Sequence, residues 1–124
     1  MTMHLNDMDM TAVQIYGIPV ALLAFFDWRF LRFRMVKARL PELLKQGAVV
    51  IDVRSAQEFA AAASPGSINI PLSELGKERS CLDREKPVVV CCASGTRSAA
   101  ARMILRKNGF KVVLNAGPWT DTVV

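Results

Sequence analysis

The sequence has few of the residues that metal sites and disulfide frameworks need. Its 124 residues include one histidine, His4, and three cysteines, of which Cys91 and Cys92 are adjacent. Neighbouring cysteines close only a small strained ring, and no second cysteine pair accompanies them, so the pattern fits neither a disulfide framework nor a zinc site. We therefore predict no metal and no other cofactor, and a reducing setting in which the thiols are free for chemistry or burial.

The sequence also lacks a dense patch of positive charge. The formal net charge is +5, and the excess lies after residue 34, where thirteen basic side chains accompany eight acidic ones. Such an excess is typical of a domain that attracts anions, whether small substrates, nucleic acid or acidic lipid, or it only maintains solubility. No run of Lys and Arg is interleaved with aromatic residues in this region, so we predict no nucleic-acid partner.

One apolar stretch stands apart from the rest of the chain. Residues 10–26 carry no charge, and five basic side chains follow within residues 28–39. Seventeen residues in a helix reach roughly 25 Å, at the short limit for a bilayer core of about 30 Å. The stretch predicts a hydrophobic helix that anchors the protein in the membrane, with the basic flank and the main domain on the cytoplasmic side. An apolar helix packed on the domain or on a partner is the alternative.

The rest of the chain is long enough for one domain with a modest core. We assign residues 1–35 to the hydrophobic segment with its basic flank, and residues 36–124 to the folded domain.

Short strands alternate with helices beyond residue 36. β-branched and apolar runs predict strands at residues 48–52, 67–70, 86–92 and 111–115. Capping residues, Pro and Gly predict the helices. The first is at 40–47, with Pro41 in its first turn, and the second is at 56–63, after a Ser55/Glu58 capping box. A helical turn follows at 71–75, and the last helix, at 98–109, is capped by Ser98 and closed by Gly109. The alternation predicts an α/β fold, with a mainly parallel central sheet flanked by helices and preceded by the N-terminal hydrophobic helix.

The strand at 86–92 ends in the two adjacent cysteines, followed by Ala-Ser-Gly-Thr-Arg. The carboxyl ends of parallel strands form the edge of a sheet that faces ligands. Small side chains and Gly95 let the backbone curl so that its amides converge, and the following helix adds the positive end of its dipole. Such a loop lowers the pKa of a thiol and binds an anion, to which Arg97 adds a fixed charge. A lone cysteine at a strand end is usually inert, but these features together favour a nucleophile that needs no histidine base.

Four blocks of the sequence resemble the rhodanese-like family of single-domain thiosulfate sulfurtransferases. They are, in family order and spacing, residues 49–59, 65–75, 88–102 and 109–119. The resemblance covers residues 36–124 and leaves the hydrophobic segment outside. It implies a rhodanese fold and an enzyme in which a cysteine becomes a persulfide. The sulfur comes from a small anionic donor such as thiosulfate, and it passes to a thiol acceptor or to cyanide.

The family's active loop, Cys-x-x-Gly-x-Arg with Ser often following, matches the chain from Cys92 onward. The resemblance thus implies that Cys92 is the nucleophile and that Arg97 orients the anion. The backbone amides that would surround the outer sulfur belong to Ala93, Ser94, Gly95, Thr96, Arg97 and Ser98.

Three more positions are interpreted from the same resemblance. Asp52 and Arg54 match the family's Asp-Val-Arg and imply a structural role at the strand end. Glu58, by its capping-box spacing from Ser55, is interpreted as a helix cap. Ala63 stands where many relatives have histidine, which changes the rim of the site and leaves the nucleophile in place.

Two other functions remain open. Counted from Cys91, the loop to Arg97 has the seven residues of related phosphatases and arsenate reductases, but adjacent strand residues point in opposite directions, and Gly95 falls in register only from Cys92. Cys91 is therefore predicted to pack against a helix. The second alternative is a non-enzymatic persulfide carrier or sensor that delivers sulfur to a membrane partner. Cys81, in a polar loop, is either a resolving thiol or an incidental surface cysteine.

Overall fold

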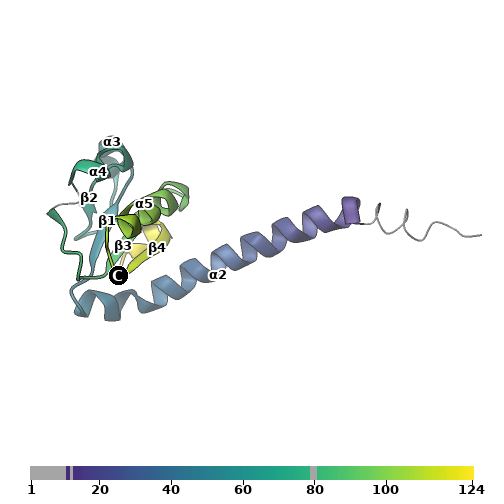
Figure 1. Cartoon of the computed structure of the whole chain (residues 1–124), viewed down its shortest axis with the longest axis horizontal. Helices are drawn as coiled ribbons and strands as arrows, with labels where there is room; N and C mark the ends of the chain where they lie inside the picture. Colours follow the sequence, from purple (N-terminus) through teal and green to yellow (C-terminus); the bar gives the residue numbers. More distant parts are fainter. Residues whose placement is uncertain (1–10, 12, 79–80) are drawn as a thin grey trace, which may run out of the picture. The chain divides into compact units, whose positions relative to one another are not determined.

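A computed structural model describes residues 11, 13–78 and 81–124 (Figure 1). The chain divides into two compact units, one up to Arg32 and one from Phe33 to Val124. The first unit contains a π-helical turn, Val13–Gly17, and the beginning of helix α2, Ile18–Lys45. The second unit contains the remainder of α2 and the whole sheet.

The second unit is built on a parallel sheet with the strand order β2-β1-β3-β4 in the described residues. The strands are β1 (Val49–Asp52), β2 (Ile68–Asn69), β3 (Val88–Cys92) and β4 (Val113–Pro118). All three pairings are parallel. Every residue of β3 is buried, as expected of an apolar strand between two neighbours. The predicted α/β fold with a parallel central sheet is confirmed.

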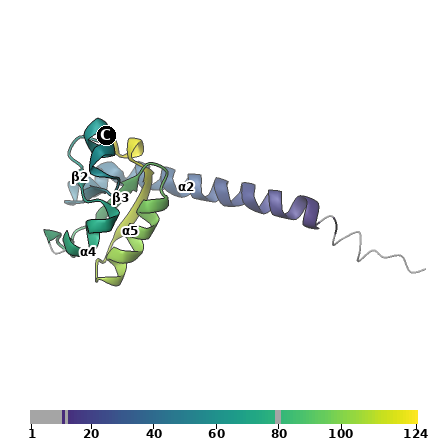
Figure 2. The same ribbon diagram turned by 90° about the horizontal axis from the view of Figure 1, so that it is seen from above.

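Helices cover both faces of this sheet. Figures 1 and 2 show α5, Thr96–Lys107, running alongside β3 and β4. A second, short helix, α4, comprises Leu75–Glu78. The core on the α5 side includes Ile51, Val90, Cys92, Ala101 and Leu105. The core on the other side includes Val50, Val89, Cys91 and Ala116 together with Leu40 and Leu43 from the end of α2. Neighbouring residues of each inner strand therefore belong to different cores, because side chains alternate across a strand.

Helix α3, Ala56–Ala61, begins at the predicted capping box. Ser55 Oγ accepts from the Glu58 amide at 3.2 Å, and Glu58 Oε1 accepts from the Ser55 amide at 3.2 Å. The helix ends before Ala63 because Ala62 is extended, with φ −166° and ψ 139°. The capping box thus starts α3 within a few residues of the end of β1.

The helix predicted at residues 40–47 is not separate, and the prediction of a helix start at Pro41 is wrong. Pro41 lies inside α2 and removes one backbone donor there. Leu40 and Leu43 are buried against the sheet, with 2% and 4% of their surfaces exposed. Their burial and the helix-forming residues around Pro41 offset the missing hydrogen bond.

The predicted membrane anchor is not supported. In the part of the chain that the structure describes, no helix is long and apolar enough to cross a membrane. Residues 10 and 12 of the predicted stretch lie outside the described residues, and residues 13–17 form the π-helical turn. Helix α2 runs without a charge only over residues 18–26, about 14 Å, before Asp27 and Arg29.

The last helix and strand differ from the predicted ranges. Helix α5 begins at Thr96 with Gly95 as its N-cap, because Gly95 has φ +99° and turns the chain directly into the helix. Ser98 is therefore not the cap; it lies in the first turn. Gly109 closes the helix with φ +90°, as predicted. Strand β4 continues to Pro118, beyond the predicted end at residue 115.

Candidate functional site

Cys92 lies at the carboxyl end of β3, where the chain turns through a short loop into α5. Its side chain is buried, and the Gly95 amide donates to Cys92 Sγ at 2.9 Å. Ser98 Oγ lies 3.4 Å from the same sulfur. The amides of Ser94 and Ser98 also hydrogen-bond to the thiol. The structure thus brings the amides of three of the six predicted loop residues to one sulfur atom.

The other loop residues surround this arrangement. Ala93, Ser94 and Thr96 are exposed. The hydroxyls of Ser94 and Thr96 lie 3.4 Å apart. The rim of the loop at these positions is therefore small and uncharged.

The surroundings of Cys92 favour its thiolate. Burial raises the pKa of Cys92, but hydrogen bonds from the side chain and amide of Ser98 and from the amides of Gly95 and Ser94 outweigh it. The net result is a pKa below the ordinary value of 9.0. The first turn of α5 adds the positive end of the helix dipole at the same place. A thiolate fraction at neutral pH is what a cysteine nucleophile requires.

Cys91 has the opposite environment. It is fully buried in the core on the α2 side of the sheet, whereas Cys92 belongs to the core on the α5 side. Burial, with the charge of Asp52 as the next cause, raises the pKa of Cys91 to about 12. This thiol is therefore not available as a nucleophile at neutral pH, and the loop counted from Cys91 has no support in the geometry.

Asn115 of β4 is not among the predicted site residues, yet it joins three parts of the site. Its Oδ1 accepts from Ser98 Oγ at 2.7 Å and from the Gly117 amide at 2.9 Å. Its Nδ2 donates to the Gly95 carbonyl at 3.1 Å. One amide side chain thus connects the Cys92 loop, the first turn of α5 and the end of β4. The available signal was an asparagine in an otherwise apolar strand.

Arg97 and Glu58 form an ion pair beside the loop. Arg97 Nη1 donates to Glu58 Oε1 at 2.7 Å, and Nη2 donates to Oε2 at 3.0 Å. The hydrogen bond from Arg97, followed by that from the Ser55 amide, lowers the pKa of Glu58 from 4.5 to about 2. The interpretation of Glu58 as a cap is therefore incomplete, because the same carboxylate also fixes the position of the Arg97 guanidinium. The role of Arg97 in orienting an anion stays a prediction.

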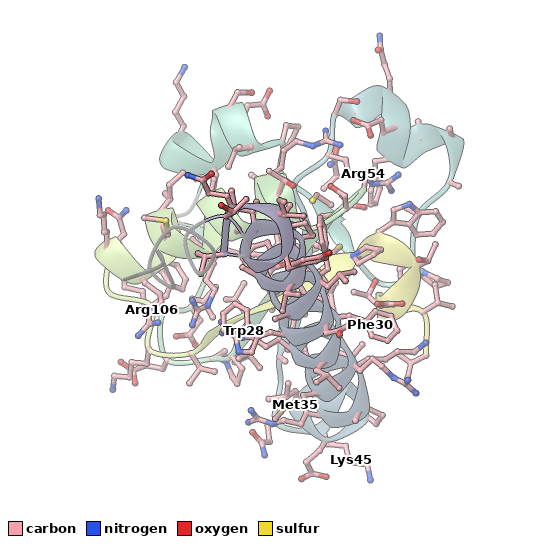
Figure 3. All side chains as sticks on the ribbon, turned by 90° about the vertical axis from the view of Figure 1, so that its right-hand side faces the viewer. Trp28, Phe30, Met35, Lys45, Arg54 and Arg106 are labelled. Atoms are coloured by element: carbon pink, nitrogen blue, oxygen red, sulfur yellow. The ribbon has the colours of Figure 1, made fainter. Side chains whose placement is uncertain are left out.

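Asp52 and Arg54 form a buried ion pair at the end of β1 (Arg54 is labelled in Figure 3). Arg54 Nη2 and Nε donate to Asp52 Oδ2 at 2.7 and 2.9 Å. The same guanidinium donates to the carbonyls of Glu58 at 3.4 Å and Ala62 at 2.8 Å, and it lies 4.7 Å from the centre of the Trp119 ring. Arg54 therefore ties α3 and the segment after it to the sheet, a geometry that suits the predicted structural role.

Two other predicted positions lie outside this cluster of contacts. Ala63 follows the carbonyl that Arg54 binds and is partly buried. Cys81 is exposed, and residues 79 and 80 lie outside the described residues. Among the residues that the structure describes, no three His, Cys, Asp or Glu side chains gather closely enough to hold a metal ion.

The sequence matches the family profile of the rhodanese-like domain over residues 36–121. The chain belongs to the rhodanese-like domain family. The match includes Cys92, its loop, Glu58, Arg54 and Asn115, and it begins three residues after Phe33.

Individual relatives of this rhodanese-like domain agree with that assignment. It is 39% identical over 74 residues to the thiosulfate sulfurtransferase PspE of Escherichia coli, covering 57% of this chain and 70% of that protein. It is 37% identical over 75 residues to YrkF of Bacillus subtilis, for which a role as a sulfur carrier protein has been suggested, covering 57% of this chain. The matched region spans 40% of the length of YrkF.

The fold is also similar to that of solved rhodanese structures. The human single-domain sulfurtransferase TSTD1 superposes with a TM-score of 0.60 at 32% identity, covering 68% of this chain and 88% of the human one. Together with the named relatives, this similarity supports sulfur transfer as the general activity of the domain.

Proposed function

We propose that this rhodanese-like domain is a sulfurtransferase that carries sulfane sulfur as a persulfide on Cys92. The observation that carries the proposal is the Gly95 amide, which donates to Cys92 Sγ at 2.9 Å, with the Ser98 hydroxyl 3.4 Å from the same sulfur. Donors that stabilise a thiolate also suit the negative outer sulfur of a persulfide. The resting thiolate and the loaded intermediate are thus favoured by the same loop.

The proposed reaction has two displacement steps. In the first, the Cys92 thiolate attacks the outer sulfur of thiosulfate, the sulfur–sulfur bond of the donor breaks, and sulfite leaves with the bonding electron pair. In the second, an acceptor thiolate or cyanide attacks the outer sulfur of the Cys92 persulfide. The Cys92 thiolate then leaves, which restores the resting enzyme. Neither step calls for a metal or a general base, because the loop lowers the pKa of the nucleophilic thiol and so favours its thiolate.

The choice of sulfur transfer over phosphate chemistry rests on which cysteine lies under the amides. A loop counted from Cys92 to Arg97 contains six residues. The seven-residue loop of the phosphatase alternative would need Cys91, which is fully buried with its pKa raised to about 12. Hydrolysis of a generic aryl phosphate, or arsenate reduction, that depends on Cys91 would revive that alternative.

Transfer of sulfur from thiosulfate to cyanide tests the proposal. Formation of thiocyanate by the full-length protein should be abolished in Cys92→Ser and largely retained in Cys91→Ser, which removes the neighbouring thiol as a matched control. A stable persulfide on Cys92 with negligible turnover toward either cyanide or small thiols would favour the carrier function instead. Loss of transfer in Cys91→Ser alone would contradict the assignment of the nucleophile.

A further inference from the structure

An aromatic side chain from α2 lies against the Cys92 loop. A Cβ atom placed on Gly95 would come within 2.6 Å of Phe33 Cζ, and a Cβ atom placed on Gly117 would come within 2.6 Å of Phe33 Cδ2. The Phe33 ring therefore occupies the space that a side chain at either position would need. Phe33 lies three residues before the segment 36–121 that matches the family profile.

The two glycines under the ring have specific tasks in the site. The Gly95 amide donates to Cys92 Sγ, and the Gly117 amide donates to Asn115 Oδ1. Both have positive φ, +99° for Gly95 and +76° for Gly117. Glycine is the residue with the greatest backbone freedom, so a loop built on it keeps one conformation only where its surroundings restrict it.

Hydrogen bonds and one packing contact restrict the backbone of Gly95. Its carbonyl accepts from Asn115 Nδ2 at 3.1 Å and from the Ala99 amide at 3.0 Å. Its amide donates to Cys92 Sγ at 2.9 Å, and its Cα lies under the Phe33 ring. Water can replace the hydrogen bonds to Asn115 and Cys92 if the backbone of Gly95 rotates. The ring removes the space into which the Cα would move, and a hydrogen bond to the sulfur keeps its strength only in a narrow range of angles.

We propose that Phe33 is a positioning residue for the Cys92 nucleophile, which holds the Gly95 amide on Sγ by covering Gly95 and Gly117. The inference rests on the proposed function only in taking Cys92 as the nucleophile. It assigns to a residue before the matched domain an influence on the ionisation of the catalytic thiol, exerted through the Gly95 amide. Substitution of Phe33 leaves the residues of the loop unchanged and loosens the conformation that they share.

The test measures thiol ionisation and sulfur transfer separately in the full-length protein. The first readout is the rate of Cys92 alkylation by iodoacetamide as a function of pH, followed by peptide mass spectrometry so that exposed Cys81 is counted apart. The second is thiocyanate formation from thiosulfate and cyanide. The variants are Phe33→Ala, Phe33→Leu, which retains apolar bulk, and Met35→Ala as the control on the same helix. Met35 is labelled in Figure 3 and is 65% exposed.

Phe33→Ala should raise the pH midpoint of Cys92 alkylation by about 0.5 to 1 unit, because one of several donors to the thiolate is weakened. At neutral pH the alkylation and transfer rates should both fall, by about three- to tenfold. Phe33→Leu should show a smaller shift in the same direction, and Met35→Ala should match the unsubstituted protein.

An unchanged alkylation midpoint in both Phe33 variants would overturn the proposal. If Phe33→Ala does not fold, as judged by circular dichroism, the midpoint of Phe33→Leu decides in the same way. The proposed function is tested by a different readout. If the unsubstituted protein transfers no sulfur, the proposed function fails, and the alkylation midpoints of the Phe33 variants still show whether Phe33 controls the ionisation of Cys92.

Discussion

Arg97 of α5 and Glu58 of α3 are joined by two hydrogen bonds, Nη1 to Oε1 at 2.7 Å and Nη2 to Oε2 at 3.0 Å. The two residues are 39 positions apart in the chain. Glu58 is also part of the capping box that starts α3, so the ion pair connects the start of α3 to the first turn of α5. The position of the Arg97 charge beside the Cys92 loop therefore depends on a residue of another helix.

Glu58→Gln should lower sulfur transfer by about tenfold, because Arg97 loses its charged partner and its fixed orientation. Glutamine keeps an acceptor for the Ser55 amide, so the capping box itself is retained. Steady-state rates of thiocyanate formation measure the effect. The control is Glu85→Gln, which removes the exposed ion pair with Lys111 and should leave the rate unchanged. Equal rates for the two variants would show that the Arg97 orientation is not needed.

The Glu58 carboxylate also predicts an acid-dependent loss of stability. Its pKa is lowered from 4.5 to about 2 in the folded protein, first by the hydrogen bond from Arg97 and then by that from the Ser55 amide. A carboxylate whose pKa is lowered by folding stabilises the folded state at pH values above its pKa in the unfolded chain. This stabilisation is lost as the pH falls from 4.5 toward 2.

Urea unfolding at a series of pH values checks this dependence. The stability difference between the unsubstituted protein and Glu58→Gln should be constant above pH 4.5 and should shrink as the pH approaches 2. Since the pair is partly exposed, added salt should reduce the difference. A difference that does not vary with pH would mean that the carboxylate charge contributes nothing to stability.

The buried pair of Arg54 and Asp52 predicts a much larger effect on stability. Arg54→Met removes the guanidinium from a site where the side chains are only 5% and 0% exposed, and it leaves the Asp52 carboxylate without its charged partner. The free energy of unfolding should fall by about 3–5 kcal/mol. Urea unfolding measures it against Arg106→Met, an exposed position in the last turn of α5 (labelled in Figure 3), where the loss should stay below about 1 kcal/mol. Similar losses at the two positions would rule out a structural role specific to Arg54.

Asn115→Asp should raise the pKa of Cys92. The substitution keeps an oxygen for Ser98 and Gly117 but removes the donor to the Gly95 carbonyl, and it places a negative charge near the thiolate. The pH midpoint of Cys92 alkylation should rise by about one unit. Asn108→Asp, at the C-cap of α5 and remote from the loop, is the control and should leave the midpoint in place. A midpoint that does not move in Asn115→Asp would show that Asn115 has no influence on the thiol.

Much of the fold follows from local sequence. The uninterrupted apolar run of β3 and the capping box of Ser55 and Glu58 each specify their element without tertiary information, and both are found as predicted. The extent of α2 does not follow in this way. Pro41 reads locally as a helix start, and only the burial of Leu40 and Leu43 against the sheet shows why the helix continues through it.

The residues of the candidate site likewise fall into those that a local motif predicts and those that only tertiary packing brings to the site. Cys92 and its loop are contiguous in the chain, so a motif predicts them together, and strand alternation predicts that Cys91 belongs to the other face. Asn115, Glu58 as the partner of Arg97, and Phe33 reach the loop from distant parts of the sequence. Their contacts arise from the packing of β4, α3 and α2, which no local pattern encodes.

Cys92 as the sulfur-carrying nucleophile is tested most directly by mass spectrometry of the intact protein after incubation with thiosulfate. The unsubstituted protein and Cys91→Ser should each gain the mass of one sulfur atom, located on Cys92 by peptide mapping and removed by cyanide or dithiothreitol. Cys92→Ser should gain none. Sulfur found on Cys91 or Cys81 in the unsubstituted protein, or a loaded Cys92→Ser variant, would contradict the assignment.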